Sequence, residues 1–316
     1  MALSSPTHTS PDTPEAGLRP RLRFAPSPNG FLHLGHAYSA FETWRIADAL
    51  GGDVLLRIED IDVARSRETF VDAIVEDLGW LGLAWSGPVR RQSAHFEMYD
   101  RAAQQLREAG LLYPSAMSRR DIAHAVARHA TWPRDPDGAP RFERSLEASA
   151  PEDNSTSTAW RLDMARCLAI AGDRLSWREF IPPEGRLPRE QESTRHARRM
   201  KTIARAAQPE VWGDVMLQRK DIPTTYHLSV VVDDAAQGIT HVVRGQDLEA
   251  ATDIHALLQH QLGLPQPLYH HHALITDVSG RKLAKRFADT SLRSLREAGW
   301  SVADVRAAVG QGPASN

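Results

Sequence analysis

The apolar residues between positions 21 and 80 change their spacing in a way that few folds accommodate. Residues 21–25 and 54–58 are short apolar runs, which are typical of buried strands. Each run precedes a segment in which apolar residues recur at helical spacing, first at 40–50 and then at 70–78. Strand, helix, strand and helix in this order predict an α/β fold with a doubly wound parallel sheet.

Signals for turns and further elements support this alternation. Gly51 is expected to end the first helix, and Ser66 is predicted to cap the second. Further along, residues 226–233 (YHLSVVVD) and 239–243 (ITHVV) are predicted to be strands, and a helix is predicted for 251–262. The chain is therefore expected to form a Rossmann-like nucleotide-binding domain in two halves, with an insertion between them.

The middle of the chain has the composition of a connection. WPRDPDGAP and SAPEDNSTS are rich in loop-forming residues, with weak periodicity around them. The N-terminal residues are rich in Ser, Thr and Pro, as flexible tails are. The predicted parts are a flexible tail at 1–20, the first half of the catalytic domain at 21–110, a connecting insertion at 111–205, the second half at 206–275, and a basic loop with a short helical part at 276–316.

Composition narrows the class of protein. A hydrophobic content of 41% and a charged content of 25% are ordinary for a soluble globular enzyme. No apolar run approaches the roughly 20 residues that cross a membrane, and the N-terminal residues lack the apolar core of a secretion signal. The single cysteine, Cys167, excludes an internal disulfide and suits a reducing cytoplasm. Because the net charge is −2, a nucleic-acid partner would have to bind a local patch.

The stretch RFAPSPNGFLHLGHA combines a rigid turn with two histidines, His33 and His36, at the start of a predicted helix. A zinc site, a catalytic base and a nucleotide cradle are all compatible with histidines at this spacing. A zinc site lacks the nearby acids and cysteines that it would need. Helix N-termini that follow parallel strands offer free N–H groups to anions, which favours the nucleotide cradle.

A second basic motif, GRKLAKR, spans Gly280 to Arg286 and follows an apolar stretch and a turn. By itself it is equally typical of a solvated loop. Histidines at a helix start together with a lysine loop suit nucleotidyl transfer from ATP, in which charge develops on phosphoryl oxygens. A carboxylate nucleophile is already ionised at neutral pH, so this chemistry needs no general base.

The motifs resemble those of a known family. HLGH and KLAKR are similar to the two signatures of class I aminoacyl-tRNA synthetases, and RFAPSPNGFLHLGHA, LLRIEDID and VVDDAAQGITHVVRGQDL resemble the glutamyl branch. About 30 residues follow Arg286, where a glutamyl-tRNA synthetase would continue with a helical anticodon-binding domain. No such domain is therefore expected, and the chain resembles the stand-alone subfamily of glutamyl-Q tRNA(Asp) synthetases.

This resemblance implies an activity and its partners. The expected reaction is ATP-dependent activation of L-glutamate to glutamyl-adenylate, followed by transfer of glutamate to the queuosine base of tRNA(Asp). ATP is a substrate and is accompanied by Mg²⁺. We expect a cytoplasmic enzyme with no membrane partner, and nothing in the sequence demands more than a monomer.

Site residues follow from the matching motifs and from the charges of glutamate. Arg23 and Arg244 are expected to bind carboxylates, Glu59 to bind the α-ammonium group, and Ser27 and Tyr226 to add hydrogen bonds. The alternative for Arg23, Glu59 and Arg244 is a purely structural ion-pair network. Around ATP, the resemblance implies that His33 and His36 stabilise the α-phosphate transition state, Lys285 holds the β- and γ-phosphates, and Lys282 is a weaker candidate for the same task.

The chain also departs from the family's pattern. Ser115 and Met117 stand where many relatives have a pair of zinc-binding cysteines, so no zinc is expected. A basic helical face is predicted as either a tRNA contact or a solvated surface, formed by Arg195, Arg198, Arg199, Lys201 and Arg205. Other hypotheses are a truncated glutamyl-tRNA synthetase that charges a tRNA 3′ end, a non-catalytic RNA-binding paralogue, and a small-molecule adenylyltransferase.

Overall fold

The computed structural model describes residues 19–149, 158–172, 175–184, 200–275 and 290–310. Most of the predicted N-terminal tail and the whole GRKLAKR motif, with Lys282 and Lys285, lie outside these ranges.

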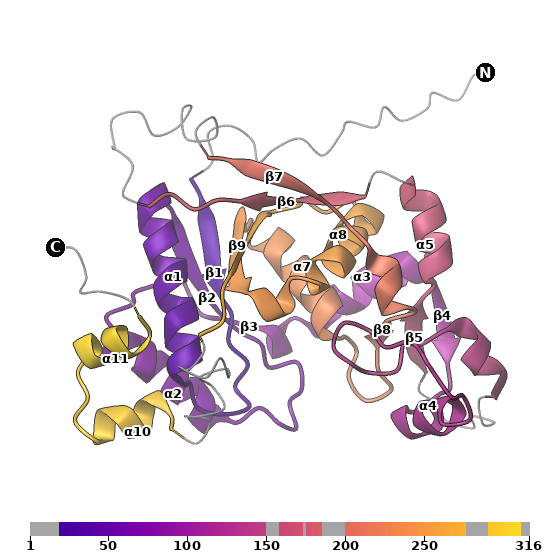
Figure 1. The fold of residues 1–316 in the computed structure, drawn as a ribbon, viewed down its shortest axis with the longest axis horizontal. Helices are drawn as coiled ribbons and strands as arrows, with labels where there is room; N and C mark the ends of the chain where they lie inside the picture. Colours follow the sequence, from indigo (N-terminus) through magenta and orange to yellow (C-terminus); the bar gives the residue numbers. More distant parts are fainter. Residues whose placement is uncertain (1–18, 150–157, 173–174, 185–199, 276–289, 311–316) are drawn as a thin grey trace.

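Two sheets, in which most neighbouring strands are parallel, lie side by side in the described molecule (Figure 1). The first sheet is β1 (Arg21–Phe24), β2 (Asp53–Ile58) and β3 (Arg90–Arg91), all parallel. The second sheet has the order β7-β6-β10-β9, with β7 (Thr202–Ala206) antiparallel to β6 (Ser176–Phe180), and with β10 (Leu268–His272) parallel to both β6 and β9 (His241–Gly245). The Thr240 amide donates to the Arg21 carbonyl at 2.9 Å, which joins β9 to β1.

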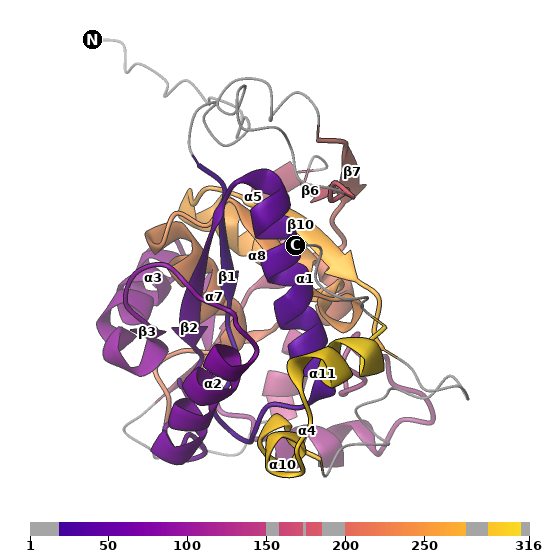
Figure 2. The ribbon, with the colours of Figure 1, turned by 90° about the vertical axis from the view of Figure 1, so that its left-hand side faces the viewer.

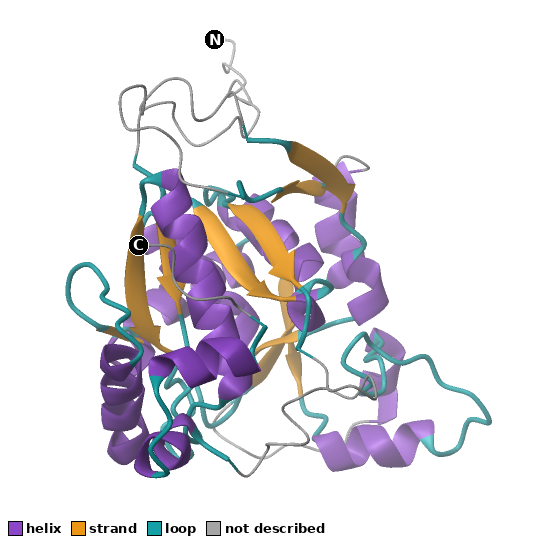
Figure 3. Ribbon diagram, turned by 60° about the vertical axis from the view of Figure 1, so that its left-hand side comes forward, coloured by secondary structure: helices purple, strands orange, loops and turns teal. Residues whose placement is uncertain are grey.

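Helices cover both faces of these strands (Figure 3). Leu22, Val54 and Leu56 point into a core shared with α1 (Leu34–Leu50) and α2 (Glu68–Trp80). Successive residues of a strand face opposite sides. Arg23 and Arg57, which alternate with these apolar residues, therefore point the opposite way, toward α7 (Tyr226–Ala236). A second core on that side packs α7 against α3 (Phe96–Glu108) and α8 (Ala251–Leu262).

The segments between the two halves form a smaller layer. Within the described residues, β4 (Leu112–Ser115), β5 (Ala159–Leu162) and β8 (Met216–Gln218) make an antiparallel sheet. It is accompanied by α4 (Arg119–Val126) and by α5 (Met164–Ala171). Short 3₁₀ turns occur at Gln92–Ala94, Arg144–Ser149, Pro209–Trp212 and Gln246–Leu248. β6 belongs to the predicted insertion but pairs with β10 of the predicted second half, and β8 belongs to that second half but pairs with β5 of the insertion. The strand pairing therefore crosses the predicted domain limits, which stay a prediction.

Two short helices close the described chain, α10 (Leu292–Glu297) and α11 (Val302–Ala308). Figure 2 shows them beside α1 and α2. Arg296 joins α10 to α2 through Glu76 at 2.9 Å, and the Arg306 guanidinium lies 4.0 Å from the centre of the Phe41 ring on α1. The predicted α/β class, with a parallel sheet and a short helical C-terminal part, is thus confirmed. None of the helices in the described ranges is long and apolar enough to cross a membrane.

Some local predictions were wrong. Residues 226–233 form helix α7 instead of a strand. Leu228, Val230 and Val231 are all buried in this helix, and an apolar run that is buried on every side has no periodicity that separates helix from strand. Ser66 does not cap α2: its hydroxyl donates to the Asp62 carbonyl at 2.9 Å, and Arg67 occupies the N-cap position.

The prediction of a basic helical face was also wrong for the part of it that the structure describes. Residues 202–206, which include Arg205, form the exposed edge strand β7. The Arg205 guanidinium pairs with Glu179 of the neighbouring strand at 2.8 Å. Arg195, Arg198 and Arg199 lie outside the described residues.

Candidate active site

A cavity of about 400 Å³ lies where β1, β2 and β9 end. The carboxyl ends of neighbouring parallel strands meet at one edge of a sheet, which is where α/β proteins bind ligands. Six residues predicted from the sequence line this cavity: Arg23, Ser27, His36, Glu59, Tyr226 and Arg244. The structure therefore brings together every residue predicted to bind glutamate and one of the two histidines.

The two histidines cap α1 reciprocally. His33 is the N-cap residue, and its Nδ1 accepts a hydrogen bond from the Gly35 amide at 3.0 Å. The His33 amide in turn donates to Nδ1 of His36 at 3.2 Å. A neutral imidazole that accepts at Nδ1 carries its proton on Nε2, so each ring keeps one N–H donor for a ligand. His36 borders the cavity, whereas His33 borders a neighbouring hollow with Ser291 and Arg293.

Burial keeps both rings uncharged. It lowers the pKa of His33, and burial together with the nearby His33 ring lowers the pKa of His36 to about 3. The ring centroids lie 3.9 Å apart, so two imidazolium charges would repel each other strongly at this site. At neutral pH the start of α1 therefore offers N–H donors and a helix dipole to an anion, and no charged imidazole.

Behind the cavity lies a buried ion-pair network, the alternative considered for Arg23 and Glu59, whose central residue Arg57 sequence reasoning missed. Arg57 of β2 is fully buried, and its guanidinium contacts Asp234 at 2.7 Å, Glu59 at 3.4 Å and Asp233 at 3.8 Å. Arg23 contacts the same Asp234 oxygen at 3.3 Å. The available signal was a charged residue inside an apolar run, in VLLRI and in VVVDD. Arg23 and Glu59 thus take part in a structural network and also line the cavity.

The network gives its carboxyl groups different proton affinities. Burial works to raise the pKa of Asp234, but Arg57 and Arg23 outweigh it and lower that pKa. Burial raises the pKa of Glu59 despite the opposing effect of Arg57 and Arg23. A largely buried carboxyl group with a raised pKa gains most from a cation that enters the cavity beside it.

Arg244 approaches from the other side of the cavity, near the end of β9. Only 5% of its surface is exposed. Its Nη1 donates to the Tyr226 hydroxyl at 3.3 Å, and its Nη2 donates to the Thr252 hydroxyl at 2.7 Å. Burial raises the pKa of Tyr226, so this phenol stays protonated at neutral pH.

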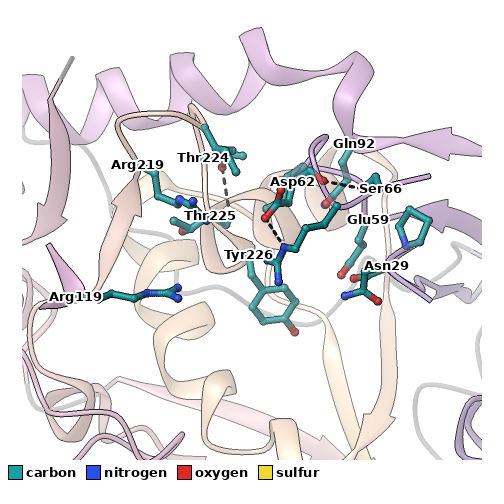
Figure 4. A pocket seen from close by; sticks show the side chains of 15 residues that line it. Asn29, Glu59, Asp62, Ser66, Gln92, Arg119, Arg219, Thr224, Thr225 and Tyr226 are labelled. Atoms are coloured by element: carbon teal, nitrogen blue, oxygen red, sulfur yellow. Dashed lines mark hydrogen bonds and ion pairs between the residues drawn. The ribbon is translucent and has the colours of Figure 1, made fainter. Parts of the chain in front are cut away.

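A second cavity of about 280 Å³ adjoins the first and shares Ser27, Asn29, Glu59 and Tyr226 with it. Figure 4 shows Arg119 and Arg219 on the side opposite Asn29 and Glu59. Arg119 is the first residue of α4, and Arg219 is held by Asp221 at 2.7 Å. Sequence reasoning missed both arginines, because they lie in a region without recognisable motifs.

The positions at which relatives have zinc-binding cysteines do not fit a zinc ion here. Ser115 is 2% exposed, and its hydroxyl accepts a hydrogen bond from Nε of Arg161 at 3.1 Å. Met117 is 3% exposed and packs in a small apolar cluster with Tyr113 and Phe142. A hydroxyl bonded to a guanidinium and a packed thioether are not the ligands that zinc prefers. Over the described ranges, no group of three or more metal-binding side chains was found.

Comparison with known proteins gives a consistent result. The model of the family "tRNA synthetases class I (E and Q), catalytic domain" matches residues 20–155 and 189–307. The glutamyl-Q tRNA(Asp) synthetase of Rhodobacter capsulatus is 44% identical over 91% of this chain and 99% of its own length. The glutamate–tRNA ligase 2 of Methylorubrum populi is 35% identical over 91% of this chain, but the match spans only 58% of that ligase.

Solved structures agree on the fold. The glutamate-tRNA synthetase of Elizabethkingia anophelis superposes with a TM-score of 0.62 at 25% identity, covering 86% of this chain and 54% of that one. The methionyl-tRNA synthetase of Mycobacterium tuberculosis, bound by methionyl-adenylate, has a TM-score of 0.51 at 15% identity and shows a shared fold alone. The chain thus spans about half the length of the solved glutamate enzyme. The resemblance predicted from HLGH and its neighbouring motifs is confirmed: the chain belongs to the catalytic-domain family of class I tRNA synthetases for glutamate and glutamine.

Proposed function

We propose that this protein activates L-glutamate with ATP and transfers the glutamyl group to the queuosine base of tRNA(Asp). One observation carries the proposal: Arg23, Glu59 and Arg244 line the same cavity as His36, at the start of α1. Glutamate has two carboxylates and one ammonium group, which two guanidinium groups and one carboxylate complement. The full-length similarity to the Rhodobacter glutamyl-Q tRNA(Asp) synthetase supports this choice within the family.

In the first step, the glutamate α-carboxylate attacks the α-phosphorus of ATP. A carboxylate–phosphorus bond forms, the bond to the β-phosphate oxygen breaks, and pyrophosphate leaves. The Nε2–H groups of His33 and His36 are proposed to donate to the phosphoryl oxygens on which charge develops. Lys282 and Lys285 are proposed to bind the β- and γ-phosphates, with Mg²⁺ accompanying ATP. No residue has to act as a base, because the nucleophile is already ionised.

In the second step, a hydroxyl oxygen of the acceptor attacks the activated carbonyl carbon and forms an ester. The bond between that carbon and the phosphate oxygen breaks, and AMP leaves with the hydroxyl proton on its phosphate. The second cavity is proposed to receive this acceptor, since it opens beside Glu59 and Tyr226. Arg119 and Arg219 would bind phosphates of the incoming RNA. The proposed partners are therefore L-glutamate, ATP and queuosine-containing tRNA(Asp). The protein is proposed to act in the cytoplasm as a monomer that binds no zinc.

A second candidate is charging of a tRNA 3′ end, which the similarity to glutamate–tRNA ligase 2 of Methylorubrum populi favours. Both activities share the first step. Glutamate-dependent exchange of pyrophosphate into ATP, measured without tRNA, tests that step. Exchange is expected with L-glutamate, and its absence would contradict both candidates.

A further inference from the structure

Arg244 hydrogen-bonds to neutral groups, unlike the other buried arginines of the site. Its Nε donates to Nε2 of His271 at 3.3 Å, and its Nη1 donates to Nδ1 of His255 at 3.3 Å. The remaining bonds go to the hydroxyl groups of Thr252 and Tyr226. All these partners, as far as the described chain provides them, are uncharged, whereas Arg23 and Arg57 bind Asp234 directly.

The chemistry of these contacts requires neutral imidazoles. A guanidinium can only donate hydrogen bonds, so each histidine nitrogen that faces Arg244 must accept. His255 then carries its proton on Nε2, which lies 3.3 Å from Nδ1 of His227. The Thr252 hydroxyl, which accepts from Arg244, lies 3.1 Å from Nε2 of His271 and can donate to it. Burial, followed by the charge of Arg244, lowers the pKa of His271 to about 3 and that of His255 well below its usual value.

Such an arrangement orients a charge without cancelling it. Thr252 and His255 lie one turn apart on α8, and His271 lies on β10, so three fixed points hold the planar guanidinium. The charge of Arg244 contributes to lowering the pKa of Asp234, but within the described chain no carboxylate bonds to Arg244 directly. Burying a charge without a direct partner is costly, and an anionic ligand relieves that cost. A neutral ligand of the same shape does not, and it would leave the charge buried and uncompensated.

Resting on the proposed function, we infer that Thr252, His255 and His271 are positioning residues that make the cavity select an amino acid with a side-chain carboxylate over its neutral amide. In this neutral cage, Arg244 meets the side-chain carboxylate of L-glutamate. Arg23, whose guanidinium already pairs with Asp234 at 3.3 Å, would then bind the other carboxylate of the ligand, the α-carboxylate.

The test compares binding of L-glutamate and L-glutamine by calorimetry, alongside glutamate-dependent exchange. Thr252→Val keeps the shape of the side chain but removes its acceptor. We expect it to weaken glutamate binding about tenfold, as for a lost hydrogen bond to a charged group, and to change glutamine binding far less. Thr252→Ser should restore the preference. His260→Asn, an exposed position on the same helix, is the matched control.

His255 provides an independent pair of variants, which carries the test if Thr252→Val proves unfolded by its melting temperature. His255→Asn retains a neutral acceptor, whereas His255→Asp places a carboxylate against Arg244 and should abolish the preference for glutamate. An unchanged glutamate-to-glutamine ratio in folded Thr252→Val or His255→Asp would overturn the inference. A wild-type protein that prefers glutamate but gives no exchange would instead contradict the proposed function alone.

Discussion

Arg57 shows how one residue supports both the fold and the site. Its guanidinium contacts three carboxylates: that of Glu59, in the loop after β2, and those of Asp233 and Asp234 on α7. Removing one partner of a buried ion pair leaves the others charged and without compensation. Arg57 therefore holds α7 against the sheet and sets the position of Glu59 in the cavity.

Replacing Arg57 by methionine tests this role. Because Asp233 and Asp234 would lose a buried counter-charge, we expect the free energy of unfolding to fall by about 3–5 kcal/mol, measured by urea denaturation. The control is Arg101→Met, which breaks an exposed pair with Glu97 and should cost less than about 1 kcal/mol. Equal losses in the two variants would show that the network contributes no more than a surface pair.

His36 can be tested separately from the stability of its helix. His36→Ala removes an N–H donor from the proposed phosphate site, and we expect the kcat of pyrophosphate exchange to fall about 100-fold or more. The same change removes one cap of α1, which should cost about 1 kcal/mol of stability. Since burial lowers the pKa of His36 to about 3, wild-type kcat should show no ionisation of His36 between about pH 6 and 8. Such an ionisation, lost in His36→Ala, would mean that the ring works in its charged form.

At the scale of elements, several units follow from the sequence because local signals and packing agree. Helix α1 ends at Leu50, and Gly51 provides the left-handed C-cap with φ of 65°. Helix α8 ends in the same way at Gly263. The wrong prediction of a strand for α7 affected the site as well as the fold. The ion pairs of Asp233 and Asp234 with Arg57 can be predicted only if this segment is known to be a helix that packs on β2. The partners of the site residues were therefore harder to predict than the site residues.

Two adjacent arginines of helix α4 allow a test of whether the second cavity binds RNA. Arg119 lines this cavity and Arg120 does not, although both are exposed and adjacent. We expect Arg119→Ala to lower kcat/KM for glutamate transfer to tRNA about tenfold, and to reduce the slope of its dependence on log salt concentration by about one. Pyrophosphate exchange should change much less, and Arg120→Ala should resemble the wild type. If Arg120→Ala has the same effect as Arg119→Ala, general surface charge and not the cavity determines RNA binding.

For the whole molecule, buried histidines should set the response to acid. Burial is the main cause that lowers the pKa of His36, His227, His241, His255 and His271 below the usual value of 6.5. The unfolded chain then binds more protons than the folded chain below that value, so stability is present above about pH 6.5 and is lost as the pH falls.

The expected loss is about 1 kcal/mol for each of these groups at pH 5.5. Urea midpoints measured from pH 7.5 to pH 5 should therefore fall steadily, with most of the change below pH 6.5. A midpoint that stays constant across this range would show that the histidines are not held neutral in the folded protein.

Across the molecule, two sections that lie far apart in the sequence meet where the parallel strands end. Arg23, Glu59 and Arg244 could be assigned to the site because they lie in motifs that resemble the family's and carry charges that complement those of glutamate. The connecting layer could not be derived in the same way, since β4, β5 and β8 are short and pair across long separations. Thr252 and His255 also escaped prediction, because their role depends on a neighbour that only the folded chain supplies.

The most direct test of the proposed function follows labelled glutamate onto tRNA. Purified protein, ATP, Mg²⁺ and labelled L-glutamate are incubated with tRNA(Asp) that contains or lacks queuosine, and nuclease fragments locate the label. We predict glutamate-dependent label on the anticodon fragment of queuosine-containing tRNA(Asp), and none on the tRNA that lacks this base. Label at the 3′ end that does not depend on queuosine would contradict the proposed transfer to queuosine and support tRNA charging instead.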